Sequence, residues 1–172
     1  MFVFIALGSN LGDTRQNILR AMARLQSFSD RPVLKSSLWQ TTPVDCPPDS
    51  PKFVNAVAGL VPRKGETPES LLKKLRALEI EFGRGPKKIP NEPRPLDLDL
   101  IAFGNEIRPG APKRGEGGNS PELILPHPRA HLRRFVLQPL SEIAPDLVLP
   151  GQGKTVAKML AGLPPDETVT RI

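Results

Sequence analysis

Two aspartates that alternate with leucines, Asp97 and Asp99, are the residues of this 172-residue chain whose types and spacing point most directly to chemistry. Successive strand residues point to opposite faces, so Leu96, Leu98 and Leu100 would share one face and both carboxylates the other, about 6.7 Å apart at their Cα atoms. Two carboxylates on one face repel each other, and acidic residues are depleted in strands. A magnesium ion, or a pair of ions about 3.5 to 4 Å apart bridged by substrate phosphates, would compensate that repulsion. The alternative is an edge strand with a hydrated polar face, whose aspartates keep other chains from pairing with it.

The surrounding sequence predicts the elements that must position these aspartates. Apolar periodicity predicts a helix that begins at Asp13, and Thr67-Pro68 begins a second helix that Gly83 ends. Strands are predicted at residues 2–7, 33–40, 53–61 and 96–100. The order strand, helix, strand, strand, helix, strand is that of an α+β, ferredoxin-like βαββαβ sheet with both helices on one face. The other face would then be free for a site, and Asn55 lies on a strand that could share it with the aspartates.

The residues after the aspartate strand predict C-terminal additions to this sheet. A turn at Gly104-Asn105 is expected to form a hairpin into residues 106–108. Residues 109–121 contain glycine, proline and charge with almost no apolar side chain, so we expect a mobile surface insertion there. No repeat and no domain boundary is evident, so residues 1–172 are predicted to form one domain. The other expected elements are short strands at 123–125 and 147–149, a helix at 135–143 that Pro139 kinks or breaks, and a helix from Thr155 to Leu163.

The composition limits the partners and the compartment. The net charge of +6 and the pI near 9.8 favour an anionic partner, which could be a nucleotide, a nucleic acid or a membrane surface. The single cysteine, Cys46, excludes an internal disulfide and a cysteine-based zinc cluster. No apolar run approaches the roughly 18 residues of a membrane span, and residues 2–7 are too few for a signal peptide. We therefore expect a cytoplasmic protein, and a monomer because no exposed apolar helix face is evident.

The chain contains several short motifs, which are Gly8-Ser9-Asn10-Leu11-Gly12, Thr42-Pro43, Phe53-Val54-Asn55, Glu79 ahead of Gly83-Arg84, Arg94-Pro95-Leu96-Asp97-Leu98-Asp99, Pro126-His127-Pro128 and Arg133-Arg134-Phe135. Taken together, these motifs resemble the 6-hydroxymethyl-7,8-dihydropterin pyrophosphokinase family of folate biosynthesis. They occur in the family's order and with similar spacing from residue 2 to about residue 149. The aspartate motif with a following histidine motif is the most specific part.

The resemblance implies a single catalytic domain that transfers the terminal diphosphate of ATP to the hydroxymethyl group of 6-hydroxymethyl-7,8-dihydropterin, leaving AMP. Such a transfer depends on charge compensation and in-line alignment more than on covalent chemistry. The resemblance also implies ATP as cosubstrate and Mg²⁺, with two ions expected on Asp97 and Asp99. It assigns catalysis to Arg84, Arg94, Asp97 and Asp99. The positions that it assigns to ATP are Glu79, Arg84, Arg94, His127 and Arg133. The positions that it assigns to the pterin are Thr42, Pro43, Val44, Phe53, Asn55, Asp97 and Phe135.

Simpler interpretations exist for most of these residues. Without the resemblance, each arginine would be a solvated surface charge, because most arginines are exposed. His127 would be a turn histidine between two prolines, and Phe53 and Phe135 would be core residues.

Three positions depart from the family pattern. Pro86 and Asn91 stand where some members carry an arginine and a tryptophan, and Pro128 stands where an aromatic residue often follows the histidine. Loop closure and nucleotide packing could therefore differ in detail.

Two other classes of protein are alternatives. Ferredoxin-like sheets bind RNA, but they do so with aromatic residues on the central strands, whereas two aspartates without metal would repel phosphate. A palm-like nucleotidyl transferase or cyclase also uses paired strand aspartates with two metals, but the small size and the pterin-type residues argue against it. The expected partners are therefore ATP and the pterin, with no nucleic acid and no membrane.

Overall fold

The computed structural model describes residues 1–42, 51–85, 92–110, 123–166 and 168–172. The strands are β1 (Val3–Ser9), β2 (Leu34–Lys35), β3 (Trp39–Thr41), β4 (Phe53–Leu60), β5 (Asp97–Phe103) and β6 (Thr170–Arg171). The α-helices are α1 (Thr14–Leu25), α2 (Pro68–Glu81), α3 (Arg134–Ile143) and α4 (Val156–Ala161), and single 3-10 turns lie at Gln26–Phe28 and Ala130–Leu132.

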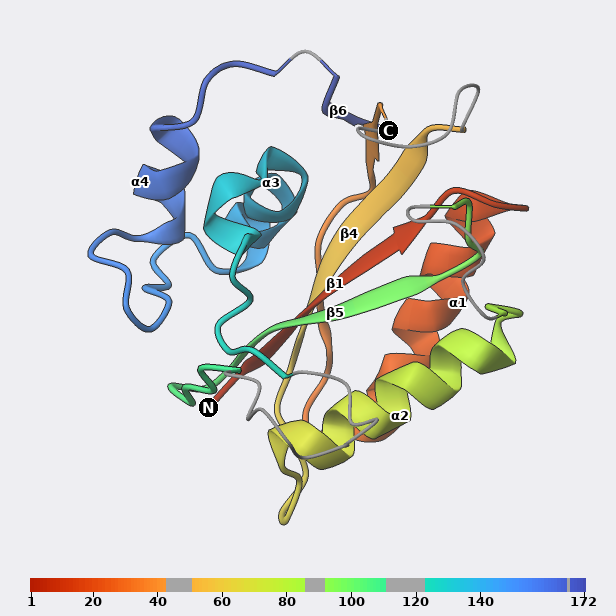
Figure 1. The fold of residues 1–172 in the computed structure, drawn as a ribbon, viewed down its shortest axis with the longest axis horizontal. Coiled ribbons are helices and arrows are strands. Elements are labelled where there is room, and N and C mark those ends of the chain that lie inside the picture. The colour runs from red at the N-terminus through yellow and green to blue at the C-terminus, as the bar shows by residue number, and fades with distance from the viewer. Residues whose placement is uncertain (43–50, 86–91, 111–122, 167) are drawn as a thin grey trace, which may run out of the picture.

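The strands form one antiparallel six-stranded sheet. Its order is β5-β1-β4-β3-β6, and β2 also pairs with β4. Helices α1 and α2 cover one face, whereas α3 and α4 lie on the opposite face (Figure 1). The predicted α+β, ferredoxin-like βαββαβ order is therefore confirmed, and α3, α4 and β6 are the C-terminal additions.

The first turns of α1 and α2 explain why these helices begin where the sequence predicts. The Asp13 carboxylate accepts a hydrogen bond from the Gln16 backbone N–H at 3.2 Å. At α2 the Thr67 hydroxyl accepts from the Ser70 N–H at 3.1 Å, while the Ser70 hydroxyl accepts from the Thr67 N–H at 2.9 Å. Such caps are worth about 1 kcal/mol each because they satisfy N–H groups that have no partner in the helix.

Each face of the sheet has its own hydrophobic core. The core under α1 and α2 contains Leu96, Leu98 and Leu100, so these leucines share one face as predicted. The core under α3 and α4 contains Phe4 and Val57 from the sheet and Val136, Leu137 and Leu140 from α3. This core covers only part of the second face. The rest of that face, near the end of β1, lines a pocket that is open to solvent.

Some predicted elements differ in the structure. The predicted strand 33–40 is divided into β2 and β3. The Gly104 turn forms, but residues 106–108 do not pair with β5. Instead, Arg108 makes an isolated bridge with Leu125. The strand expected at 123–125 is reduced to this single bridge. Residues 147–149 form no strand, and α3 continues through Pro139. Except for residues 109 and 110, the predicted insertion at 109–121 lies outside the described residues.

Within the described ranges, no helix is both long enough and apolar enough to cross a membrane.

Candidate active site

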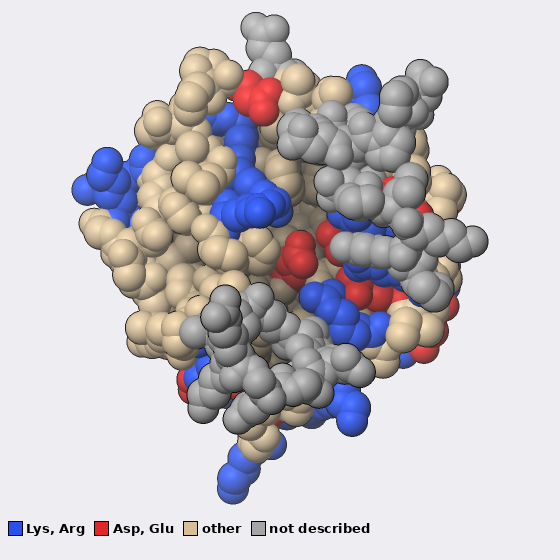
Figure 2. Space-filling model, viewed as in Figure 1, with Lys and Arg blue, Asp and Glu red and all other residues tan. Residues whose placement is uncertain are grey.

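Asp97 and Asp99 lie at the start of β5, on the sheet face opposite α1 and α2. Their partners on β1 are Gly8 and Ala6, so no large side chain stands beside the carboxylates. A Cβ atom on Gly8 would lie 3.4 Å from Oδ1 of Asn55 and 3.9 Å from Cβ of Asp97. Small residues at these two positions therefore keep the hollow open, and Figure 2 shows acidic side chains on its floor with basic side chains around them.

Two arginines hold Asp97 from the segment that connects α2 to β5. Nη1 of Arg84 lies 2.7 Å from Oδ1 of Asp97, and Nη2 of Arg94 lies 3.4 Å from Oδ2. All three side chains are largely buried, with exposed fractions of 16%, 15% and 20% for Arg84, Arg94 and Asp97. Both oxygens of this carboxylate therefore face a guanidinium group.

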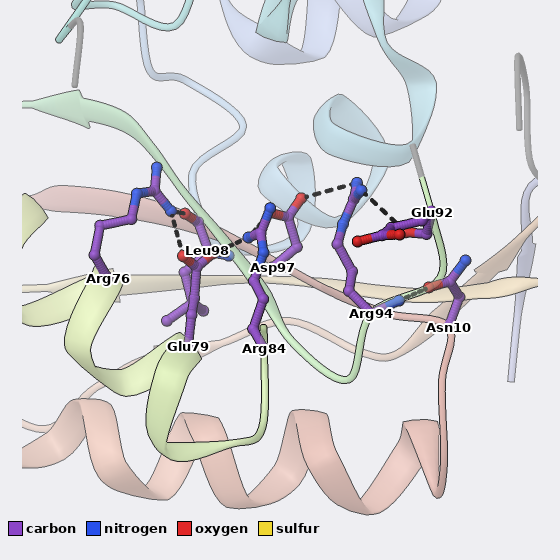
Figure 3. Close-up of polar contacts among 8 residues, drawn as sticks. All are labelled: Asn10, Arg76, Glu79, Arg84, Glu92, Arg94, Asp97 and Leu98. Carbon is purple, nitrogen blue, oxygen red and sulfur yellow. Dashed lines mark hydrogen bonds and ion pairs between the residues drawn. The ribbon is translucent and has the colours of Figure 1, made fainter. Parts of the chain in front are cut away.

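Glu79 lies beside Arg84 and connects this arginine to strand β5 (Figure 3). Its Oε2 accepts hydrogen bonds from Arg84 Nη1 at 2.6 Å and from the Leu98 backbone N–H at 2.8 Å. Its Oε1 accepts from Arg76 Nη1 at 2.8 Å, and the same Arg76 nitrogen donates to the Leu98 carbonyl oxygen at 2.8 Å. Glu79 is 3% exposed, so it is a buried carboxylate compensated by two arginines and one backbone N–H.

Asn10 fixes the backbone of Arg94 from the other side (Figure 3). Oδ1 of Asn10 accepts from the Arg94 N–H at 2.8 Å, and the Asn10 N–H donates to the Arg94 carbonyl oxygen at 3.1 Å. Nδ2 of Asn17 in α1 donates to the Pro95 carbonyl oxygen at 3.2 Å. The glycine-rich turn after β1 therefore determines where the chain enters the aspartate strand.

Asp99 differs from Asp97 in its surroundings. Burial, with a further contribution from the negative charge of Asp97, raises the pKa of Asp99 to about 6. The repulsion expected from the sequence is therefore present, and a cation in front of the two carboxylates would relieve it.

The basic groups around the site are also affected by burial. Burial alone would lower the pKa of Arg84, but the charges of Asp97 and Glu79 raise it. Burial lowers the pKa of Arg133, and burial with the nearby charge of Arg133 lowers the pKa of His127 to about 4. His127 is therefore neutral at physiological pH, and its Nδ1 accepts a hydrogen bond from the Arg129 N–H at 3.1 Å.

The aspartates stand between two hollows, which we call the arginine hollow and the aromatic pocket. Both hollows are lined by the same four charged residues, Arg94, Asp97, Asp99 and Arg133. The arginine hollow is completed by Arg76, Glu79, Ile80, Arg84 and Gly85. The aromatic pocket has a volume of about 390 Å³ and is lined also by Gly8, Thr41, Thr42, Phe53, Asn55, Arg129, Leu132, Arg134, Phe135, Asp166, Thr168 and Val169, with four further residues of β1, β4 and α3.

The aromatic pocket combines flat apolar faces with one fixed amide. Arg94 lies over the Phe53 ring at 5.5 Å from its centroid, and Arg133 lies over the Phe135 ring at 5.4 Å. Nδ2 of Asn55 donates to the Thr41 hydroxyl at 2.9 Å, which fixes the orientation of the amide. Its carbonyl oxygen is then presented as an acceptor, a combination that suits a planar heterocycle with N–H groups on its edge.

The structure brings together most of the residues predicted for the site. Thr42, Phe53, Asn55 and Phe135 line the aromatic pocket, while the predicted arginines surround the aspartates. His127 is held by its N–H, which donates to the Ile101 carbonyl oxygen at 2.8 Å. Pro43 and Val44 lie outside the described residues, as do Pro86 and Asn91.

Other residues at the site were not predicted from the sequence. Arg76 carried no signal, because an arginine on a helix surface is ordinarily solvated. Asn10 lies within a motif of the resemblance, which assigns it no role. Arg134 likewise lies within a motif of the resemblance, which assigns it no role, and Thr41 adjoins a predicted residue. The pocket residues of the C-terminal segment carry no signal in the sequence.

The aspartates fit a magnesium site in which the protein supplies only a few of the ligands of the ion. Among the residues that the structure describes, no group of three or more histidine, cysteine or acidic side chains could hold a metal ion. Mg²⁺ is commonly held by one or two carboxylates, with substrate phosphates and water as its other ligands. Asp97 and Asp99 match that donor set, and burial together with the charge of Asp97 raises the pKa of Asp99, an effect that a bound cation would oppose.

The fold and these two joined hollows define an α+β protein whose charged site lies between two cavities. The family model of 7,8-dihydro-6-hydroxymethylpterin-pyrophosphokinase matches residues 4–145. A Pseudomonas aeruginosa 2-amino-4-hydroxy-6-hydroxymethyldihydropteridine pyrophosphokinase is 37% identical over 163 residues, covering 94% of this chain and 91% of the relative. A Synechocystis protein of the same name is 36% identical over 159 residues, covering 91% of this chain and 73% of the relative.

A solved Plasmodium falciparum HPPK-DHPS structure shares the fold, with a TM-score of 0.71 at 12% identity, covering 99% of this chain and 47% of that one. The chain thus spans less than half of the solved protein. The chain belongs to the 7,8-dihydro-6-hydroxymethylpterin-pyrophosphokinase family. Its reaction is transfer of diphosphate from ATP to 6-hydroxymethyl-7,8-dihydropterin in folate biosynthesis.

Proposed function

We propose that the diphosphate is transferred above Asp97 and Asp99, with ATP in the arginine hollow and the pterin in the aromatic pocket. The observation that carries this proposal is that Arg94, Asp97, Asp99 and Arg133 line both hollows. A phosphoryl group held by these residues would be within reach of both substrates. In-line transfer requires such a shared boundary, because donor and acceptor oxygens must lie on opposite sides of the reacting phosphorus.

Asp97 and Asp99 are the residues that would hold Mg²⁺, and two ions are expected. Bound magnesium would neutralise part of the triphosphate charge and orient the acceptor hydroxyl. Arg84 and Arg94 each lie beside one oxygen of Asp97, so an ion bound to Asp97 would compete with at least one of these guanidinium groups for the carboxylate. The phosphates of ATP offer these arginines an alternative anionic partner, so binding of the nucleotide and release of Asp97 are compatible.

Arg84, Arg94 and Arg133 bind the phosphates in this account, and His127 contacts the nucleotide as a neutral imidazole. Planar guanidinium groups suit phosphate oxygens because they donate two hydrogen bonds in parallel. Glu79, also predicted at the ATP site, has both oxygens occupied by Arg76, Arg84 and Leu98. A direct contact between Glu79 and ATP stays a prediction, and its visible contacts serve to position Arg84.

The pterin is proposed to stack against Phe53 and Phe135, with the Asn55 carbonyl oxygen accepting from its N–H edge. Thr42 lies in the same pocket, whereas Pro43 and Val44 stay predictions. The hydroxymethyl group would then point to Asp97. A monomeric state and a cytoplasmic location also stay predictions from the sequence.

The test is incubation of the protein with ATP, Mg²⁺ and 6-hydroxymethyl-7,8-dihydropterin, followed by ³¹P NMR of the products. We expect AMP and a pterin diphosphate, with the activity lost in Asp97→Asn and Asp99→Asn. Asp146→Asn, at an exposed aspartate away from both hollows, is the matched control and should keep full activity. Formation of ADP, or full turnover by the Asp97 and Asp99 variants, would overturn the proposal.

A further inference from the structure

The C-terminal segment, residues 163–166 and 168–172, lies beside the aromatic pocket, and we call it the C-terminal strap. It passes from α4 to the edge of the sheet, where β6 lies next to β3 (Figure 1). This segment lies beyond residues 4–145, to which the family model extends. Its position therefore has to be interpreted from its own contacts.

Arg134 anchors the start of the strap. Its Nη2 donates to the carbonyl oxygens of Leu163 at 3.2 Å and Pro164 at 2.9 Å, and its Nη1 contacts Gln138 Oε1 at 3.4 Å. These contacts direct the guanidinium group of Arg134 to the strap rather than to the aspartates. The neighbouring Arg133, in contrast, lines both hollows.

The sheet anchors the end of the strap. Thr170 and Arg171 pair with Gln40 and Trp39 of β3, and the Ile172 N–H donates to the Leu38 carbonyl oxygen at 3.0 Å. The strap is therefore attached on two sides of the pocket, at the first turn of α3 and at the outer strand of the sheet.

Between these anchors, Asp166, Thr168 and Val169 line the aromatic pocket together with Phe53 and Phe135. Oδ1 of Asp166 accepts hydrogen bonds from the Thr168 N–H at 2.9 Å and from its hydroxyl at 2.6 Å. This local turn gives the strap a defined shape where it faces the pocket. None of the described strap residues lines the arginine hollow.

We propose that the C-terminal strap is a substrate-binding wall of the aromatic pocket and that Arg134 is the residue that positions it. The inference rests on the assignment of this pocket to the pterin. A wall over a flat ring removes more of its apolar surface from water, which strengthens binding of the acceptor. Because the strap does not reach the arginine hollow, its loss leaves ATP binding unchanged.

The experiment compares three variants of the full chain with the unaltered protein: a chain that ends at Gly162, Arg134→Met, and Asp166→Ala. Arg63→Met is the matched control, because Nε of Arg63 also donates to a backbone carbonyl, that of Ser27 at 3.0 Å, but far from the pocket. KM for 6-hydroxymethyl-7,8-dihydropterin and KM for ATP are measured separately, and thermal unfolding verifies that each variant is folded. Asp166 is exposed, so Asp166→Ala keeps the test available if the shortened chain does not fold.

We expect KM for the pterin to rise about tenfold in the shortened chain and in Arg134→Met, because charged hydrogen bonds to two carbonyls and part of the pocket wall are lost. KM for ATP should change less than about twofold, and Arg134→Lys should recover part of the pterin affinity because lysine can still donate to a carbonyl. If the unaltered protein forms AMP but the variants show an unchanged pterin KM, or an equal rise of both KM values, the proposed wall is wrong. Absence of AMP with the unaltered protein would instead contradict the proposed site of transfer.

Discussion

The Glu79 carboxylate accepts a hydrogen bond from the backbone N–H of Leu98, the residue between the two aspartates, at 2.8 Å. Among the described strands, β5 is at the edge of the sheet, so its outer N–H and C=O groups face none of the other five. Glu79 and Arg76 occupy both outer groups of Leu98. Helix α2 therefore fixes the strand at the point where its two carboxylates face the hollow.

Glu79→Gln should weaken this connection and the site together. Glutamine can still accept from Leu98 but cannot neutralise Arg76 and Arg84, so we expect a loss of about 2 kcal/mol in the free energy of unfolding. Turnover should also fall because Arg84 loses a fixed partner. Urea unfolding and steady-state kinetics check both. Glu81→Gln, which removes an exposed ion pair with Arg24, is the control and should cost less than about 0.5 kcal/mol; equal effects of the two variants would contradict the buried role of Glu79.

Asn10→Ala should act on catalysis through the backbone of Arg94. It leaves the Arg94 N–H without its acceptor, so Arg94 should lose its fixed position beside Asp97. We expect kcat to fall about tenfold, less than the roughly 10²-fold expected for Arg94→Ala if that arginine acts mainly in the transition state. A kcat equal to that of the unaltered protein would show that Asn10 has no positioning role.

Asp99→Asn should stabilise the metal-free protein at neutral pH. The pKa of Asp99 is raised in the folded state from 3.8 to about 6, so its ionisation disfavours folding as pH rises through this window, and the full cost is present above pH 6. The variant should therefore be more stable by about 3 kcal/mol at pH 7, whereas the difference should fall below about 1 kcal/mol near pH 4. Urea unfolding in EDTA at both pH values measures the difference in the free energy of unfolding. Equal stability of the two proteins at pH 7 would show that the ionised Asp99 carboxylate does not destabilise the fold.

Phe135→Ala should weaken binding of the pterin more than binding of ATP. Loss of a stacking ring costs a flat heterocycle on the order of tenfold in affinity. Phe135→Leu separates stacking from volume, because leucine keeps apolar bulk without an aromatic face. Isothermal titration calorimetry of each substrate is the measurement. A larger loss of affinity for ATP than for the pterin would show that the pterin does not stack on Phe135.

The features that could be predicted from the sequence are those encoded by neighbouring residues. Alternation at Asp97 and Asp99 predicted a strand with separate leucine and carboxylate faces, and Thr67-Pro68 predicted the start of α2. The division of residues 33–40 could not be predicted, because it depends on distant β4: Ser36 Oγ accepts from the Val57 N–H at 2.9 Å and the Ser36 N–H donates to the Val57 carbonyl oxygen at 3.0 Å. The expected hairpin at 106–108 was wrong for a similar reason, since Arg108 pairs with Leu125.

The candidate site shows the same division between local and distant information. Motif residues such as Arg84, Arg94 and Asn55 were predicted because the resemblance placed them. Arg76 acts through the carbonyl oxygen of Leu98 at the outer edge of β5, which is 22 residues away in sequence. Arg134 acts through the carbonyl oxygens of Leu163 and Pro164, which are 29 and 30 residues away. Neither contact leaves a local pattern in the sequence.

The most direct test of the central claim is to count the Mn²⁺ ions that bind in the presence of a non-hydrolysable ATP analogue, by electron paramagnetic resonance. The unaltered protein should bind two ions per chain, and Asp97→Asn and Asp99→Asn should each bind fewer while remaining folded. If either variant binds as many ions, with the same affinity, as the unaltered protein, Asp97 and Asp99 are not the residues that hold the metal.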